Sequence, residues 1–199
     1  MLFLRKINED HLLEEFRERY ASVSGLEVPM DFLKTRAVYG AFNLANKMIG
    51  GFVLGTINPF RTIDVFASIG NREGLYSHLN GTSCCELNCL WLSVNYRKGI
   101  SVYWFWLLFA TKVSRQPEKM LICGTIAKSL ADIYGYPRKS KLLHSEDIFL
   151  NGKLRTSYIF IFAKSDFFVG VLETFVYKFR NNGRKPVMYK EINVPATAS

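Results

Sequence analysis

Residues 85–110 read CELNCLWLSVNYRKGISVYWFWLLFA, and this stretch decides which fold the sequence predicts. Its first part alternates apolar with other residues, which predicts a strand over 84–94. The loop NYRKG, residues 95–99, follows, and from there the apolar positions keep helical spacing as far as Ser114. We therefore expect a strand that runs through a short basic loop straight into a helix.

The basic loop has the properties of a phosphate-binding site. A helix start presents unpaired N–H groups and the positive end of the helix dipole, so backbone donors bind a phosphate placed there. Arg97 and Lys98 add positive charge, and Gly99 lets the backbone approach the phosphate closely. The sequence therefore predicts an anion site at this loop, with Ile100 and Ser101 at the start of the helix.

Strands and helices follow one another along the rest of the chain. The hydrophobic patterns predict further strands over 2–7, 37–45, 48–55, 120–124, 141–150 and 156–164. They predict helices after Asp10, briefly after Pro29, over 125–134 and over 165–180, and either two short helices or a loop insertion over 59–81. Turn signals at Asn46-Lys47 and Asn151-Gly152 predict two hairpins. This order predicts one domain over 1–199, in which a C-terminal helix and a polar tail begin at about residue 165.

The chain is basic, with 26 Lys and Arg against 17 Asp and Glu and a formal net charge of +9. Such a surplus suits a nucleic acid, an anionic lipid, a phosphorylated cofactor or an acidic protein. Because no dense Lys/Arg run is present, the sequence does not favour a nucleic-acid partner. The apolar stretches are too short or too interrupted for a membrane span, and the first residues lack the order of a secretory signal. We expect a cytoplasmic protein.

The cysteines and the aromatic residues are expected mainly in the core. Cys84, Cys85, Cys89 and Cys123 have no His or further Cys at the spacing of a zinc site. We therefore expect buried, reduced thiols and no metal. Aromatic residues make up 15% of the chain, which indicates either a thick core or a pocket for an apolar ligand.

The strand, loop and helix of residues 85–110 resemble the donor site of GNAT enzymes. In that family the loop pattern is Gln or Arg, two residues, Gly, one residue, then Gly or Ala, and here the frame reads YRKGIS over 96–101. Tyr96 and Ser101 depart from the pattern, and Arg97 supplies a displaced arginine. Upstream, ELNCLWL over 86–92 resembles the fourth strand of a GNAT branch that includes long-chain N-acyl amino acid synthases, with Cys89 at that branch's usual arginine position.

The resemblance implies a fold and a donor. The fold is the α/β (α+β) GNAT fold, a central mixed, mostly antiparallel sheet flanked by helices, which can be laid over residues 1–164. The donor is an acyl-CoA, or the acyl-phosphopantetheine of an acyl carrier protein, whose phosphate the loop binds. The strand normally splays at Leu92 and Val94 in this family, so their N–H groups are expected to polarise the thioester carbonyl and to bind the pantetheine arm.

The resemblance also implies one catalytic residue. Glu86 is the carboxylate closest in sequence to the site, and its implied role is the general base that takes a proton from the ammonium acceptor. A solvated or purely structural Glu86 is the alternative. The family often places a tyrosine as general acid in the helix after the fifth strand, but the matching position is near Ala131. Tyr134 and Tyr136 are nearby, and His144 is a base, a substrate contact or structural, so no acid is assigned.

Three functions follow from the resemblance. The first is an N-acyltransferase that takes a long acyl group from an acyl carrier protein. The positive charge suits that acidic partner, and an acyl channel is expected to be lined by Tyr103, Trp104, Trp106 and Phe109. The second is an acetyl-CoA-dependent N-acetyltransferase, and the third is a non-catalytic GNAT-like binding domain. The acceptor amine stays open among an amino acid, a peptide side chain and a polyamine, with residues 59–81 and the C-terminal helix as the natural places for its specificity.

Overall fold

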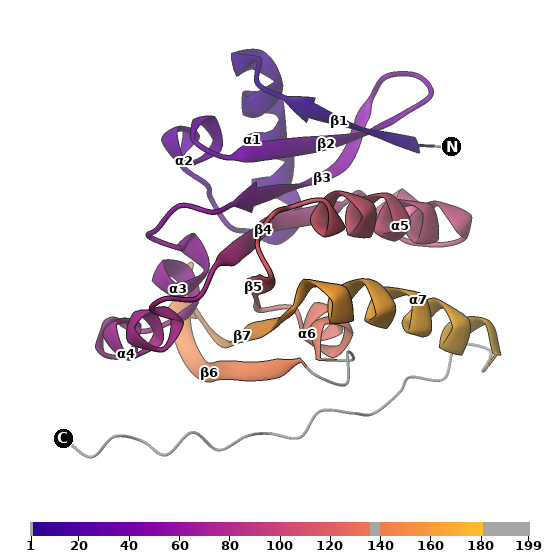
Figure 1. The fold of residues 1–199 in the computed structure, drawn as a ribbon. Coiled ribbons are helices and arrows are strands. Elements are labelled where there is room, and N and C mark those ends of the chain that lie inside the picture. The colour runs from indigo at the N-terminus through magenta and orange to yellow at the C-terminus, as the bar shows by residue number, and fades with distance from the viewer. Residues whose placement is uncertain (1, 136–139, 181–199) are drawn as a thin grey trace.

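The computed structural model describes residues 2–135 and 140–180, and its strands form one seven-stranded sheet (Figure 1). The spatial order is β1-β2-β3-β4-β5-β7-β6, and every neighbouring pair is antiparallel except β4 with β5, which is parallel. This confirms the expected mixed, mostly antiparallel sheet. The strands are β1 (Leu2–Ile7), β2 (Ala37–Asn43), β3 (Met48–Gly55), β4 (Cys84–Leu92), β5 (Met120–Thr125), β6 (Lys141–Leu150) and β7 (Lys153–Ala163).

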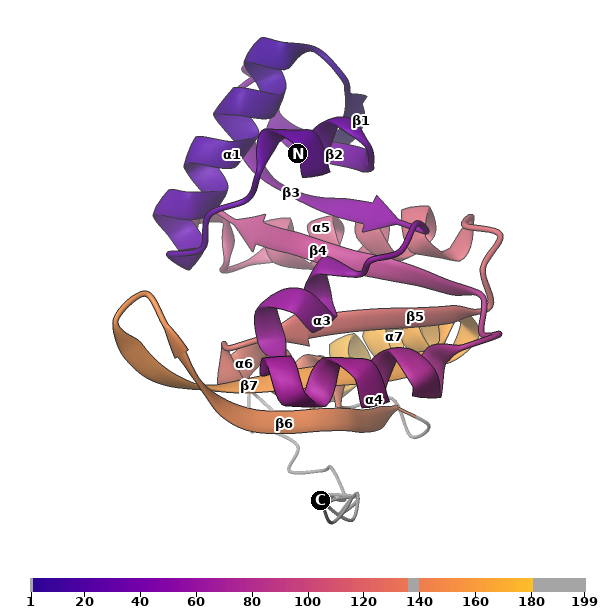
Figure 2. The ribbon, with the colours of Figure 1, turned by 90° about the vertical axis from the view of Figure 1, so that its left-hand side faces the viewer.

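Helices cover both faces of the sheet, as Figure 1 and Figure 2 show from two sides. One face carries α1 (Asp10–Ser24), α2 (Met30–Lys34), α3 (Arg61–Phe66) and α4 (Ile69–Leu79). The other face carries α5 (Ile100–Ser114), α6 (Lys128–Tyr134) and α7 (Lys164–Arg180). A short 3-10 helix, η1 (Val94–Tyr96), lies between β4 and α5. Within residues 2–135 and 140–180, no helix combines the length and apolar character that a bilayer span requires.

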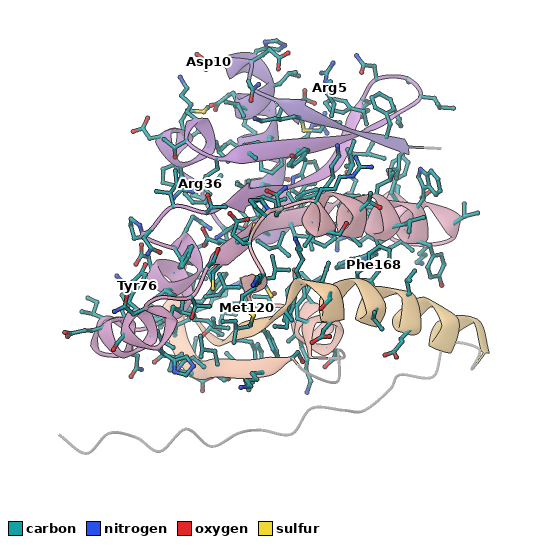
Figure 3. All side chains as sticks on the ribbon, in the orientation of Figure 1. Arg5, Asp10, Arg36, Tyr76, Met120 and Phe168 are labelled. Carbon is teal, nitrogen blue, oxygen red and sulfur yellow. The ribbon has the colours of Figure 1, made fainter. Side chains whose placement is uncertain are left out.

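Aromatic side chains anchor α5 to the sheet and to α7. Phe109 of α5 packs edge-to-face on Phe52 of β3, with ring centroids 4.7 Å apart, and on Phe167 of α7 at 5.3 Å. Trp106 packs on Phe109 at 5.4 Å, and all four side chains are buried. Figure 3 shows side chains filling the space between the sheet and both helical layers. Because each such ring buries a large apolar area, the helix that begins at the basic loop is held firmly to the core.

The C-terminal hairpin follows the predicted Asn-Gly turn. Asn151 and Gly152 have φ of 50° and 73°, the left-handed conformation that a two-residue hairpin turn requires. Pairing therefore begins at once, with Leu150 opposite Lys153, and β7 starts three residues before the predicted position. The backbone twist of this turn matches that of the strands, so pairing continues up to the turn. The apolar pattern of β7 alone does not show this earlier start.

Local hydrogen bonds explain two other boundaries that differ from the predicted ones. The strand β4 ends at Leu92 and not at residue 94, because the N–H of Tyr96 donates to the Ser93 carbonyl and opens η1. Helix α6 starts later than residue 125, because the Thr125 hydroxyl ends β5 by accepting the Ala127 N–H. Residues 59–81 form the two short helices α3 and α4, the first of the two expected forms.

Gly51 of β3 tests how closely the sheet is packed. A Cβ at this position meets the backbone carbonyl of Tyr39 and the ring of Phe16, so we expect Gly51→Ala to lower the free energy of unfolding by about 2 kcal/mol or more. Gly74 of α4 is the matched control, because a Cβ there meets nothing within 4 Å. Gly74→Ala is expected to raise stability by about 0.5–1 kcal/mol through helix propensity. Urea unfolding of both variants makes the comparison, and equal effects would contradict the close packing.

Candidate active site

A cavity of about 490 Å³ lies where β4 and β5 part. The two strands pair only from Cys84↔Met120 to Leu87↔Cys123, after which no β4–β5 pairing continues. Beyond that point, the cavity is walled by residues 87–92 of β4 and by the end of β5. Side chains of α1 and α3 contribute from one helical layer, and those of α5 and α6 from the other. The cavity therefore passes through the sheet and connects its two faces.

A β-bulge at Cys89 accompanies the parting of the strands. In the β3–β4 register, Gly51 pairs with Trp91 and Val53 pairs with Asn88. One residue separates the two paired positions in β3, but two residues separate them in β4, so β4 contains one extra residue. Cys89 adopts φ 51°, which is unusual for a side chain other than glycine, and its N–H donates to Asn88 Oδ1 at 2.8 Å. The bulge reverses the inside–outside alternation of the strand, because Cys84 and Trp91 pack in the same core cluster although seven positions apart.

The backbone of Leu92 faces the gap. The next N–H, that of Ser93, donates to the Ile49 carbonyl of β3 at 2.8 Å. In an antiparallel ladder the bonding groups of successive residues alternate in direction, so the N–H and C=O of Leu92 point away from β3. The Leu92 carbonyl accepts a hydrogen bond from Arg97 Nε at 2.7 Å, which agrees with that direction. Leu92 also lines the cavity, whereas Val94, 67% exposed in η1, does not.

The basic loop lies beside this opening. Arg97 lines the cavity, while Lys98, Gly99, Ile100 and Ser101 lie outside its wall. Gly99 has φ 67° and caps α5, and a Cβ at this position would have nothing within 4 Å. The space above the start of α5 is therefore open. A positive φ at this point is what glycine adopts without strain.

Glu86 lies under the cavity wall and not on it. The side chain is 1% exposed, and its Oε1 accepts the Thr62 N–H at 2.5 Å and the Asn88 amide at 3.1 Å. Thr62 is in the first turn of α3, whose dipole favours a carboxylate. The other carboxylate oxygen of Glu86, Oε2, has no hydrogen-bond partner in the described part of the chain. Glu86 is thus not solvated, and Asn88, which contacts it, is the residue that reaches the cavity.

Arg61 completes a buried polar network around Asn88. Its Nη1 donates to Asn88 Oδ1 at 2.9 Å, and its Nη2 donates to the Glu27 carbonyl at 2.5 Å. The guanidinium and the Glu86 carboxylate are therefore joined through one amide. A buried cation and a buried anion each cost several kcal/mol unless they are bonded in this way. Neither Arg61 nor Asn88 has a local sequence signal of this role, because the bond between them joins α3 to β4.

Two tyrosines of the wall keep their protons. Burial raises the pKa of Tyr20, in α1, and raises the pKa of Tyr134, in α6, well above its usual value. A phenol that stays protonated at neutral pH can serve as a hydrogen-bond donor or a general acid. Tyr134 also packs on Phe160, with ring centroids 6.2 Å apart, so it contributes to the core as well as to the cavity wall. Tyr136 lies outside the described residues.

His144 is part of a structural contact elsewhere. Its Nε2 is 2.9 Å from Glu146 Oε1, and neither residue lines the cavity. Glu146 also accepts the Ser68 N–H just before α4 and the Asn71 amide. Burial acts to raise the pKa of Glu146, but the hydrogen bonds from Ser68 and His144 outweigh it and the pKa is lowered. This carboxylate joins β6 to α4.

All four cysteines are free and buried, as expected. Burial raises the pKa of the Cys84 thiol to about 11 and that of Cys85 to about 12. The pKa of Cys89 is likewise raised by burial to about 12, and that of Cys123 is raised well above its ordinary value. Cys89 is the one that contributes to the cavity wall among the described residues.

Of the four aromatic residues expected to line an acyl channel, one lines this cavity. Trp106 lines the cavity, but Tyr103, Trp104 and Phe109 do not. Phe109 is fully buried in the aromatic core, and Trp104 turns its Nε1–H to the Leu2 carbonyl at 2.8 Å. The helical repeat of α5 distributes its aromatic residues around the axis, so only one side of the helix meets the cavity. Other apolar residues of the wall include Leu90, Trp91, Val102, Phe105, Ile126 and Leu130.

Arg155 of β7 is a second arginine in the wall that the sequence did not reveal. It lies in the first residues of β7, before the start at residue 156 that the sequence predicts for this strand. The tip of its hairpin contacts the residue that follows α1, where the Asn151 amide donates to the Gly25 carbonyl. No local pattern encodes a contact between residues so far apart in sequence.

Comparison with known proteins gives matches in structure only. No protein-family model matches the sequence, and no curated protein matches it in sequence. FeeM, an N-acyl amino acid synthase from uncultured soil microbes, superposes with a TM-score of 0.62 at 8% identity, over 84% of this chain and 93% of that chain. A spermidine N-acetyltransferase from Vibrio cholerae, in complex with CoA and spermine, gives 0.52 at 11% identity, over 83% and 97%. An N-acetyltransferase from Staphylococcus aureus Mu50 gives 0.54 at 9% identity, over 83% and 99%. At such identities the likeness concerns the fold alone.

Asn88 is expected to hold the bulge and the buried charges together. Asn88→Ala removes the acceptor of both Arg61 and the Cys89 N–H, so the free energy of unfolding is expected to fall by about 2–4 kcal/mol. Asn71→Ala is the control, because this exposed amide also bonds a carboxylate, that of Glu146, and its loss is expected to cost about 1 kcal/mol or less. Denaturant unfolding measures both. A cost for Asn88→Ala no greater than that for Asn71→Ala would contradict the network's importance.

Proposed function

We propose that this chain, which has the GNAT fold, is an N-acyltransferase that moves an acyl group from a thioester to an amine. The thioester is an acyl-CoA or the acyl-phosphopantetheine of an acyl carrier protein. The observation that carries the proposal is the cavity of about 490 Å³ between β4 and β5. Because it connects the two faces of the sheet, a thioester entering beside the basic loop can meet an amine entering from the layer of α1 and α3.

The basic loop supports binding of the donor's phosphate. Arg97, beside the cavity, and Lys98 supply charge, and the start of α5 supplies the N–H groups of Ile100 and Ser101. Gly99 leaves the approach open. The Arg97 bond to the Leu92 carbonyl ties this loop to the strand end where the thioester would lie. Phosphate and thioester sites are thereby set at a fixed separation.

The reaction requires a polarised carbonyl and a free amine. In this proposal the Leu92 N–H, which points into the gap, donates to the thioester oxygen as negative charge develops on it. The Val94 N–H, outside the wall, binds the pantetheine arm. The amine nitrogen attacks the carbonyl carbon, the C–N bond forms as the C–S bond breaks, and the proton lost by the amine is balanced by the proton gained by the leaving thiolate.

Two residues of the chain serve the proton transfers. Glu86 is proposed as the base that takes the ammonium proton, and its unpartnered Oε2 is the atom that receives it. Since Glu86 lies behind the wall, the transfer passes through a bridging water beside Asn88 and not by direct contact. Tyr134 is proposed as the acid that protonates the thiolate, because it lies in the wall on the side of α5 and α6.

A fatty acyl donor is favoured over acetyl by the size and character of the cavity. A volume of about 490 Å³ lies in the usual range of sites for drug-sized ligands, and much of the wall is apolar. The net charge of +9 favours encounter with an acidic carrier protein. An acetyl-CoA-dependent N-acetyltransferase is the second candidate, because three of the four aromatic residues expected in an acyl channel are outside the wall.

The experiment that tests the function compares donors. Acetyl, octanoyl and hexadecanoyl thioesters of CoA and of acyl carrier protein are supplied with a mixture of amines, at low and high salt, and thiol release and amide products are measured. We expect transfer to improve with chain length by roughly 0.8 kcal/mol per methylene until the cavity is full. We expect high salt to lower the apparent affinity for carrier-bound donors. At an ionic strength of about 0.1–0.15 M, the attraction between exposed charges is already screened beyond about 8–10 Å, and more salt shortens this distance.

Each other outcome of this comparison has a definite meaning. A preference for acetyl-CoA with no salt effect on carrier-bound donors would establish the acetyltransferase and exclude the long-chain function. If the protein binds a donor but forms no amide from any of the donors, we would conclude that it is a non-catalytic binding domain.

Glu86→Gln tests the base. The variant keeps the oxygen that accepts the Thr62 N–H but cannot take a proton, so turnover is expected to fall by about 10² or more with donor affinity unchanged. Glu146→Gln is the matched control, because Glu146 also accepts a backbone N–H at the start of a helix but lies outside the cavity wall. Rates, donor affinity by calorimetry and melting temperature are measured for both. Turnover of Glu86→Gln within a few-fold of the wild type would remove Glu86 from this role.

A further inference from the structure

The cavity wall carries positive charge and no negative charge. Among the residues that the structure describes, its charged side chains are Arg97 and Arg155, and neither aspartate nor glutamate contributes to it. Arg97 is accounted for by the phosphate of the donor. Arg155 is not, and a second cation in a site without carboxylates calls for a second anion.

Arg155 enters the cavity from the face opposite to Arg97. Successive residues of a strand point to opposite faces, so Arg155 points to the same face as Ser157. The Ser157 hydroxyl donates to the Phe66 carbonyl of α3 at 2.8 Å, which places both residues on the side of α1–α4. Arg97 precedes α5 on the other side. The two arginines thus approach one cavity from its two layers.

The β6–β7 hairpin borders the cavity at Arg155. The Asn151 amide at its tip donates to the carbonyl of Gly25, which follows α1. Figure 2 shows the hairpin reaching toward the end of α1. Tyr20, Val23 and Ser24 of that helix end also line the cavity, so Arg155 lies beside a mouth formed by the hairpin and α1.

The Arg155 guanidinium is available to a ligand. It makes no ion pair or hydrogen bond with any residue in the described ranges. The neighbouring carboxylates of its hairpin are already engaged: Glu146 accepts from Ser68 and Asn71, and Asp147 accepts the Thr156 hydroxyl at 2.7 Å. The side chain therefore projects an uncompensated planar cation, the geometry that binds carboxylates through two parallel hydrogen bonds.

We infer that Arg155 binds a carboxylate of the acceptor, so that the acceptor amine is an amino acid and not a polyamine. The inference rests on the proposed function and selects among the acceptors that it leaves open. A carboxylate held by Arg155 directs the amine of the same molecule toward the gap between β4 and β5. A polyamine would instead place its second ammonium in a wall that has two arginines and no carboxylate, where like charges repel.

The test compares acceptors that differ only in the carboxylate. Wild type, Arg155→Gln and Lys153→Gln are supplied with a pool of the standard amino acids, with the matching amino acid amides and with spermidine, and acylated products are measured by mass spectrometry. Lys153 is the control because it is an exposed cation of the same hairpin outside the cavity wall. We expect the wild type to prefer free amino acids, and Arg155→Gln to lose about 10- to 100-fold on these with transfer to the amides unchanged. Lys153→Gln is expected to match the wild type.

A binding measurement separates failure of this inference from failure of the proposed function. Calorimetry with an N-octanoyl amino acid and with its amide requires no turnover. Tighter binding of the acid, lost in Arg155→Gln and kept in Lys153→Gln, supports the inference even if no acceptor is acylated, in which case only the proposed function fails. Equal binding of acid and amide, equal use of both as acceptors, or preference for spermidine overturns the assignment of Arg155.

Discussion

The parting of β4 from β5 is the constraint on which the rest of the structure depends. Two parallel strands that stay paired to their ends would leave no room in the sheet and would commit the Leu92 N–H to a ladder bond. Pairing instead stops at Leu87↔Cys123, and the extra residue at Cys89 bends β4 away. The two halves stay apart because each is held elsewhere: β4 by β3 and the anchored α5, and β5 by β7 along its whole length.

An opening inside a sheet leaves polar groups that must be bonded again. At the bulge, Asn88 supplies several of these hydrogen bonds. Its side-chain oxygen accepts from Arg61 and from the Cys89 N–H, and its side-chain nitrogen donates to Glu86. The network also links the opening to α3, whose first turn holds the Glu86 carboxylate. The same few hydrogen bonds therefore set the position of α3, the shape of the bulge at Cys89 and the place of the Glu86 carboxylate. A change to any one of these features alters the other two.

Features that depend on neighbours in sequence could be predicted, and features that depend on distant contacts could not. The loop of residues 95–99 and the Asn151-Gly152 turn were predicted because glycine, basic residues and a helix start act locally. The bulge at Cys89 has no such signal, since neither glycine nor proline marks it. The place of Glu86 behind Asn88, and that of Arg155 in the wall, follow from packing of α3 and α1 on the sheet. The roles predicted for Glu86 and for residues 97–101 remain predictions.

The conformation of Cys89 has a chemical consequence of its own. A thiolate beside a thioester can displace its thiol and leave the acyl group on the protein, and Cys89 stands in the wall of a cavity proposed to hold a thioester. Burial raises the pKa of this thiol to about 12, so the thiol and not the thiolate is the form present at neutral pH. If the cavity holds a thioester as proposed, a Cys89 kept in its thiol form is a poor nucleophile toward it, so transfer of the acyl group to the protein's own sulfur is disfavoured.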